Sequence, residues 1–177
     1  MLKDYEIDMP VLETDAMIKV LFICTGNICR SPMAEFAMKK IVEDMGIKDD
    51  FYIESAAITT EEIWNGIGNP VYPPARTELK RRGIGNTPYT DFSGKRARQI
   101  ARSDYDKYDY ILCAESHHVS SATRICGGDP EGKIMRMLEF SDHPRNIADP
   151  WYTGIFDVAY NDIEESIYAF LRHLGYC

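Results

Sequence analysis

The stretch that decides the fold is "IKVLFICTGNICRSPMAEFAMKKIVEDMG", residues 18–46. It opens on residues 18–23, an apolar run interrupted only by Lys19, which is typical of a strand buried on both faces of a sheet. Residues 31–46 follow with a helical pattern, in which Pro32 is tolerated in the first turn and Gly46 comes after the last. The stretch therefore predicts a strand that passes into a helix through a short turn.

The same alternation continues along the chain. Further strands are predicted within residues 51–56, 106–114 and 133–138. Further helices are predicted at residues 73–84, 115–128 and 156–176. Because strands alternate with helices, we expect a three-layer α/β/α fold around a small, mainly parallel, twisted sheet of about four strands. Ligands of such sheets bind beyond the carboxyl ends of the strands, where the first turn lies.

Length and charge narrow the class of protein. We expect residues 17–177 to form one domain and the acidic residues 1–16 to be a mobile N-terminal extension. A formal net charge of −8 argues against binding to nucleic acid or to a membrane surface. The chain has neither a membrane-length apolar run nor a signal peptide, and its five cysteines are an odd number, so we expect a cytoplasmic protein with reduced thiols.

The turn after the first strand has the composition of a phosphate cradle. Five residues separate Cys24 from Arg30, so the backbone N–H groups between them can point inward around a tetrahedral dianion, at the positive end of the helix. Gly26 and Asn27 tolerate the positive φ angles that such a curl needs. Arg30 can hold two phosphate oxygens with its planar fork. The predicted phosphate-binding residues are Thr25, Gly26, Asn27, Ile28, Cys29, Arg30 and Ser31.

Cys24 lies at the base of this cradle. Hydrogen-bond donors that hold a dianion also stabilise a thiolate, and the hydroxyl of Ser31 is placed to donate a further hydrogen bond to that sulfur. The residues therefore predict a nucleophilic cysteine in a phosphate-binding loop.

The sequence here resembles the low-molecular-weight protein tyrosine phosphatases. "VLFICTGNICRSPMAE", residues 20–35, is similar to the family's N-terminal signature, and the resemblance continues in "IESAAI", "GNPVYPPAR", "ARQI", "YDYILC" and "DPWYTG". It implies the family's three-layer fold and a phosphoric monoester hydrolase that acts on a phosphotyrosine protein or peptide and releases inorganic phosphate. Cys24 would be the nucleophile and Arg30 the ligand of the phosphoryl group.

The resemblance also implies a general acid and a slot for the tyrosine ring. The family's acid is the aspartate of an Asp-Pro motif, which is Asp149 here, and in the second step the same group would activate water. Trp151 and Trp64 would line the slot, together with Tyr152. We interpret residues 61–70 as a mobile rim loop. No metal or cofactor is expected, because the histidines are scattered and no carboxylates cluster.

Other positions extend or depart from the resemblance. Asn27 and Ser55 would join Ser31 in a buried hydrogen-bond network. Isoleucine at position 28 is usual in the tyrosine-directed members, whereas threonine marks a branch acting on phosphoarginine. In the family, the cysteine equivalent to Cys29 can form a protective disulfide with the nucleophile. The departures from the family pattern are Lys95, where some relatives have a supporting histidine, and Ala114-Glu115, where many have Met-Asp.

Three points stay open at this stage. One alternative is an arsenate reductase on the same fold, with Cys113 and Cys126 as relay thiols. The other is a non-catalytic phosphopeptide-binding module, although that class would be expected to lose Cys24 or Asp149. The oligomeric state is expected to be a monomer or a weak homodimer.

His117 and His118 are interpreted as solvated helix residues.

Overall fold

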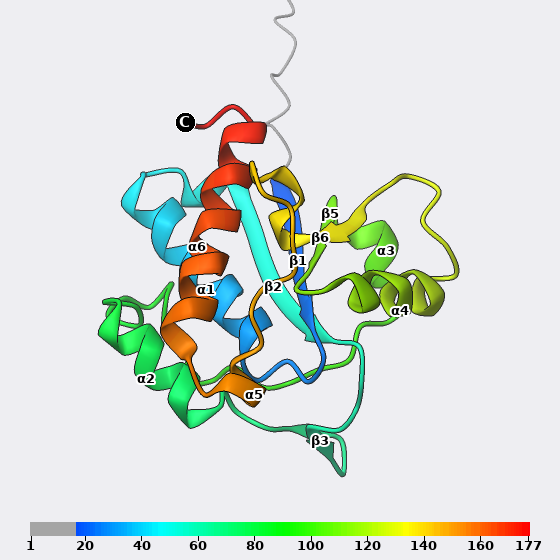
Figure 1. Ribbon diagram of the computed structural model, residues 1–177, viewed down its shortest axis with the longest axis horizontal. Coiled ribbons are helices and arrows are strands. Elements are labelled where there is room, and N and C mark those ends of the chain that lie inside the picture. The colour runs from blue at the N-terminus through cyan, green and yellow to red at the C-terminus, as the bar shows by residue number, and fades with distance from the viewer. Residues whose placement is uncertain (1–16) are drawn as a thin grey trace, which may run out of the picture.

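The structure, a computed structural model, describes residues 17–177. The extension predicted for residues 1–16 lies outside the described residues. A parallel sheet has the strand order β2-β1-β5-β6, formed by β1 Ile18–Cys24, β2 Phe51–Ala57, β5 Tyr110–Cys113 and β6 Ile134–Arg136. Helices lie on both sides of this sheet (Figure 1). The predicted three-layer α/β/α fold is therefore confirmed.

The helices divide between the two faces of the sheet. One side carries α1 Arg30–Asp44, α2 Pro73–Arg81 and α6 Phe156–His173, and the other carries α3 Asp104–Lys107 and α4 Ser116–Cys126 (Figure 1). Short helical turns complete the chain: η1 Lys48–Asp50, η2 Met137–Phe140 and α5 Pro150–Thr153. Among residues 17–177, no helix combines the length and the apolar character needed to cross a bilayer.

Strand β1 is apolar from Val20 to Cys24 because both of its faces are buried there, whereas Lys19 near its start is exposed. Val20 and Phe22 face the core cluster under α1 and α6, whereas Leu21 and Ile23 face the cluster under α3 and α4. Each of these four side chains is at most 1% exposed. Burial on both faces fixes β1 in the centre of the sheet, and its carboxyl end carries Cys24.

Within the predicted rim loop, residues 61–70, the structure contains a short hairpin. Strands β3 Ile63–Trp64 and β4 Ile67–Gly68 pair in antiparallel fashion across the two residues Asn65 and Gly66. Both turn residues have positive φ angles, 50° and 76°, as a type I′ turn requires. The Asn-Gly pair was the sequence signal for this hairpin, which the interpretation as a loop missed. Glu61 and Glu62 of the same segment do lie at a cavity rim, and the mobility of the segment stays a prediction.

Candidate active site

The cradle connects the end of β1 to the start of α1 at the carboxyl edge of the sheet. Cys24 is 4% exposed, and the backbone N–H of Asn27 points at its sulfur, with N and Sγ 3.2 Å apart. Asn27 reaches this position with a φ angle of +60°, a conformation that asparagine tolerates better than most residues. The loop therefore curls back on the cysteine, as the sequence predicted.

A hydrogen bond connects Ser31 to the same sulfur. Ser31 Oγ lies 3.0 Å from Cys24 Sγ and accepts a hydrogen bond from Asn27 Nδ2 at 2.8 Å. The alternative acceptor for the hydroxyl proton, the carbonyl of Ala56, lies farther away at 3.5 Å. The shorter contact therefore favours donation from the Ser31 hydroxyl to the cysteine sulfur.

A buried network supports the loop from below. Asn27 Nδ2 also donates to Ser55 Oγ at 2.9 Å, and Ser55 Oγ donates to Glu35 Oε1 at 2.7 Å. Lys95 donates to the backbone carbonyl of Ser55 at 2.9 Å and forms an ion pair with Glu35 at 3.5 Å. Lys95, at the position where some relatives have a supporting histidine, therefore takes part in this support.

Arg30 is held at the helix start by three oxygen partners. Its side chain is 3% exposed, and Nη1 donates to the carbonyl of Ile147 at 2.9 Å. Nη1 also lies 3.3 Å from Glu115 Oε1, and Nη2 lies 3.4 Å from Asp149 Oδ2. The guanidinium is thus oriented before any substrate binds, and a phosphate group entering the cradle would compete with the two carboxylates for it.

Asp149 caps a short helical turn rather than lying on an open loop. Its Oδ1 accepts a hydrogen bond from the backbone N–H of Trp151 at 3.0 Å, and Pro150 begins α5. This arrangement is an N-cap, in which the aspartate satisfies a free N–H of the turn while its other oxygen faces Arg30. The cap fixes the carboxyl group above the cradle.

A cavity of about 350 Å³ opens above Cys24. The cradle supplies part of its wall, namely Cys24, Thr25, Gly26, Ile28, Cys29 and Arg30. The rim supplies the remainder, namely Glu61, Glu62, Asp149, Trp151 and Tyr152. Trp64 is not among the residues that line this cavity, and its side chain is 71% exposed on the hairpin. The place of Trp64 in a substrate slot stays a prediction.

His118 contradicts the expectation that both histidines are solvated. His117 is exposed, but His118 is fully buried and its Nε2 lies 2.9 Å from Thr25 Oγ1 in the cradle. The backbone N–H of Glu115 donates to His118 Nδ1 at 3.1 Å, so the ring proton must be on Nε2, which donates to Thr25. Burial, with the nearby Arg30 and His117, lowers the pKa of His118 to about 3.

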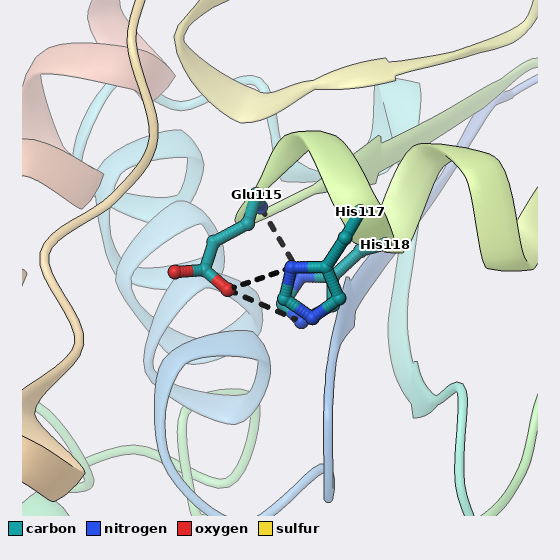
Figure 2. Close-up of side chains that lie close together, drawn as sticks. All are labelled: Glu115, His117 and His118. Carbon is teal, nitrogen blue, oxygen red and sulfur yellow. Dashed lines mark hydrogen bonds and ion pairs between the residues drawn. The ribbon is translucent and has the colours of Figure 1, made fainter.

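Glu115, His117 and His118 lie close together, with one potential ligand atom from each within 4.8 Å of the others (Figure 2). This spacing resembles a metal site, but a metal would need the lone pair of His118 Nε2, the atom that carries the proton. If Nε2 gave up its proton to bind a metal, the proton of the neutral ring would move to Nδ1, where it would face the N–H of Glu115 and break that hydrogen bond. Arg30, 3.3 Å from Glu115, adds a repelling positive charge. The three residues therefore fit a metal ion poorly. Instead, His118 orients Thr25 and Glu115 orients Arg30.

The sequence had marked Glu115 only as a departure from the family pattern and gave no functional reason for Glu35. For Glu115 a signal exists, namely its position in the predicted sheet. Glu115 follows the end of β5, beside β1, and the N–H of Ala114 donates to the carbonyl of Ile23 at 2.9 Å. Residues at the carboxyl ends of neighbouring parallel strands meet at one edge, so Glu115 could have been placed near the cradle.

Three further cysteines, Cys29, Cys113 and Cys126, are buried and protonated. Burial first, then the charges of Cys24 and Asp149, raises the pKa of Cys29 far above its ordinary value. Burial likewise raises the pKa of Cys113 and of Cys126. Among residues 17–177, Cys113 is fully buried and Cys126 is 6% exposed, so neither has the accessible thiolate that a redox relay requires. A disulfide between Cys24 and Cys29 stays a prediction.

Comparison with known proteins places this geometry in a family. The family model described as low molecular weight phosphotyrosine protein phosphatase matches residues 19–176. The chain belongs to this family. The phosphatase is therefore a hydrolase that acts on phosphotyrosine substrates. Membership of this family favours a phosphatase activity over the two alternatives, an arsenate reductase and a non-catalytic binding module.

Individual relatives agree with this assignment. The phosphatase is 35% identical over 143 residues to the low molecular weight protein-tyrosine-phosphatase YfkJ of Bacillus subtilis, a match that covers 80% of this chain and 85% of the relative. It is 35% identical over 158 residues to the rat low molecular weight phosphotyrosine protein phosphatase, covering 86% of this chain and 93% of the relative. The crystal structure of YfkJ superposes with a TM-score of 0.81 at 31% identity, covering 90% of this chain and 96% of that structure.

Proposed function

We propose that the phosphatase hydrolyses phosphotyrosine in two steps through a phosphocysteine on Cys24. In the first step the Cys24 sulfur attacks phosphorus, the bond from phosphorus to the tyrosine oxygen breaks, and Asp149 protonates that oxygen. In the second step water attacks phosphorus, Asp149 accepts its proton, and the sulfur leaves as a thiolate. Inorganic phosphate is the product.

One observation carries this proposal: Cys24, Arg30 and Asp149 line the same cavity. The backbone N–H of Asn27 and the Ser31 hydroxyl face the sulfur, so they can stabilise the thiolate that leaves in the second step. Arg30 is buried and oriented toward the cavity, so it can hold the equatorial oxygens of the phosphoryl group once these replace the carboxylates of Glu115 and Asp149 as its partners.

The rim is proposed to hold the tyrosine ring. Trp151 is 57% exposed beside Asp149, and its ring centroid lies 5.2 Å from that of Tyr72, which supports it from behind. Tyr152 lines the same cavity. An exposed, supported indole beside the general acid is suited to stack on an aromatic substrate. We also keep as proposals the monomeric or weakly dimeric state, the cytoplasmic location and the single domain of residues 17–177.

Hydrolysis of p-nitrophenyl phosphate and of a phosphotyrosine peptide tests the mechanism. We expect Cys24→Ser to lose activity on both substrates, because serine supplies no thiolate. Asp149→Asn should reduce kcat by about 10²–10⁴-fold on the peptide and less on p-nitrophenyl phosphate, whose leaving group needs protonation less. His143→Gln, at an exposed position that does not line the cavity, serves as a control that keeps activity. An inert wild type, or an active Cys24→Ser, would overturn the proposal.

A further inference from the structure

The wall of the cavity carries two carboxylates that the mechanism does not use, Glu61 and Glu62. Both side chains pack against the cradle at Gly26. A Cβ atom built on Gly26 would lie 2.9 Å from Glu62 Cγ and 3.5 Å from Glu61 Oε1. The two carboxylates therefore lie at the mouth of the pocket that contains Cys24.

Hydrogen bonds fix the segment that carries these carboxylates. The backbone N–H and the hydroxyl of Thr59 both donate to the carbonyl of Thr25, at 3.2 and 3.0 Å. Asn69 Nδ2 donates to Glu62 Oε2 at 2.7 Å, and its backbone N–H donates to the carbonyl of Glu62 at 2.8 Å. Glu62 is thus held in place at the rim, whereas the neighbouring Glu61 is exposed.

The charges at this mouth are not balanced by the protein. Within residues 17–177, neither Glu61 nor Glu62 forms an ion pair, and the only cation in the cavity wall, Arg30, is already paired with Glu115 and Asp149. A phosphate dianion that enters the pocket passes two uncompensated negative charges. That repulsion falls if the substrate carries a positive charge next to the phosphate.

We infer that Glu61 and Glu62 select substrates with a lysine or arginine adjacent to the phosphotyrosine. The inference depends on the proposed function and names its substrate class. A basic side chain beside the phosphotyrosine would pair with these carboxylates while Arg30 holds the phosphoryl group. Acidic neighbours would add a third negative charge at the mouth and bind less well. Because the ion pairs between the substrate and Glu61 or Glu62 would lie at a solvent-exposed rim, each pair should change kcat/KM by about two- to fivefold.

Three phosphopeptides that differ only in the two residues flanking phosphotyrosine, Lys, Gln or Glu, test this inference. We expect kcat/KM to be about tenfold higher for the Lys peptide than for the Glu peptide at low salt, and the ratio to shrink at high salt. In the double variant Glu61→Gln/Glu62→Gln the ratio should approach one. The KM for p-nitrophenyl phosphate, which has no flanking residue, should fall in the same variant.

A matched control separates the effect of charge at the rim from the effect of the protein's net charge on the peptide preference. Asp106→Asn/Asp142→Asn neutralises two exposed carboxylates that do not line the cavity, and it should keep the preference of the wild type. Equal rates on the three peptides, or a preference that survives the Glu61/Glu62 variant, would overturn the inference while leaving the phosphatase mechanism in place. A wild type that hydrolyses neither p-nitrophenyl phosphate nor any peptide would instead overturn the proposed function, and the inference with it.

Discussion

At the scale of single residues, His118 shows how local contacts set the ionisation of one side chain. The neutral ring accepts a hydrogen bond from the N–H of Glu115 and donates one to Thr25. A second proton would have to lie against the Glu115 N–H, in a fully buried position beside the positive charge of Arg30. The cradle therefore depends on a histidine that stays uncharged.

This requirement predicts a pH-dependent stability. The ordinary pKa of histidine, 6.5, applies to the unfolded chain, whereas the pKa in the folded protein is lowered to about 3. Between these values the unfolded chain binds a proton that the folded chain does not, so the free energy of unfolding falls as the pH falls. We expect His118 to contribute a loss of about 2 kcal/mol between pH 7 and pH 5.

Urea unfolding at the two pH values measures this loss. His118→Gln should remove most of the dependence, because glutamine does not titrate. His143→Gln is the matched control, since that histidine is exposed and does not line the cavity, and it should keep the slope of the wild type. Identical slopes in wild type and His118→Gln would show that other groups dominate acid destabilisation.

At the scale of elements, the β3–β4 hairpin is attached to the body of the protein by close backbone contact at Gly68. A Cβ atom on Gly68 would lie only 1.9 Å from the carbonyl oxygen of Ala97, which is backbone and cannot move aside alone. The neighbouring Asn69 accepts a hydrogen bond from the N–H of Ala97 at 2.9 Å. Glycine at position 68 therefore allows the hairpin to lie against residues 96–98.

Gly68→Ala should consequently displace the hairpin. We expect a loss of about 2–4 kcal/mol in the free energy of unfolding, typical of a severe steric clash at a buried position. Gly94→Ala is the control, because nothing lies within 4 Å of a Cβ atom there and its φ angle is not positive. Chemical unfolding checks both variants. A Gly68→Ala protein as stable as the Gly94→Ala protein would contradict the contact at Ala97.

At the scale of the whole molecule, the network under Cys24 joins segments that are far apart in sequence. Glu35 comes from α1, Ser55 from β2, Asn27 from the cradle and Lys95 from the connection that precedes α3. Glu35 is 4% exposed and also pairs with Lys39 at 2.9 Å. Burial lowers the pKa of Lys95, while the charge of Glu35 opposes that shift.

A double-mutant cycle measures how strongly these segments are coupled. We expect Lys95→Met to be strongly destabilising, because it leaves Glu35 buried with one cation fewer, and to cost much less in a Glu35→Gln background. The coupling energy should be about 1–3 kcal/mol. The exposed pair Lys40–Asp44 on the same helix is the control and should give about 0.3–0.5 kcal/mol. Equal coupling energies would mean that burial adds nothing to this network.

Much of the fold and part of the site could be predicted along the chain, because both follow from local patterns. The apolar run of β1, the helical period after it and the alternation of the later elements predicted the three layers. The composition of residues 24–31 predicted a loop curled around a cysteine, and Asn27 and Ser31 lie where that prediction placed them. The hairpin was missed although Asn65-Gly66 signals it.

The sequence by itself determined how the main strands and helices follow one another along the chain, and it determined the loop around Cys24. Both depend on neighbouring residues, through backbone conformation and the periodic burial of side chains. Only the tertiary structure decided which distant side chains meet there. It brought Glu115, His118 and Asp149 to Arg30 and Thr25, and it placed Glu61 and Glu62 at the mouth of the pocket. The physical reason is that contacts between segments depend on how the layers pack, and the charge of a group such as His118 depends on that packing.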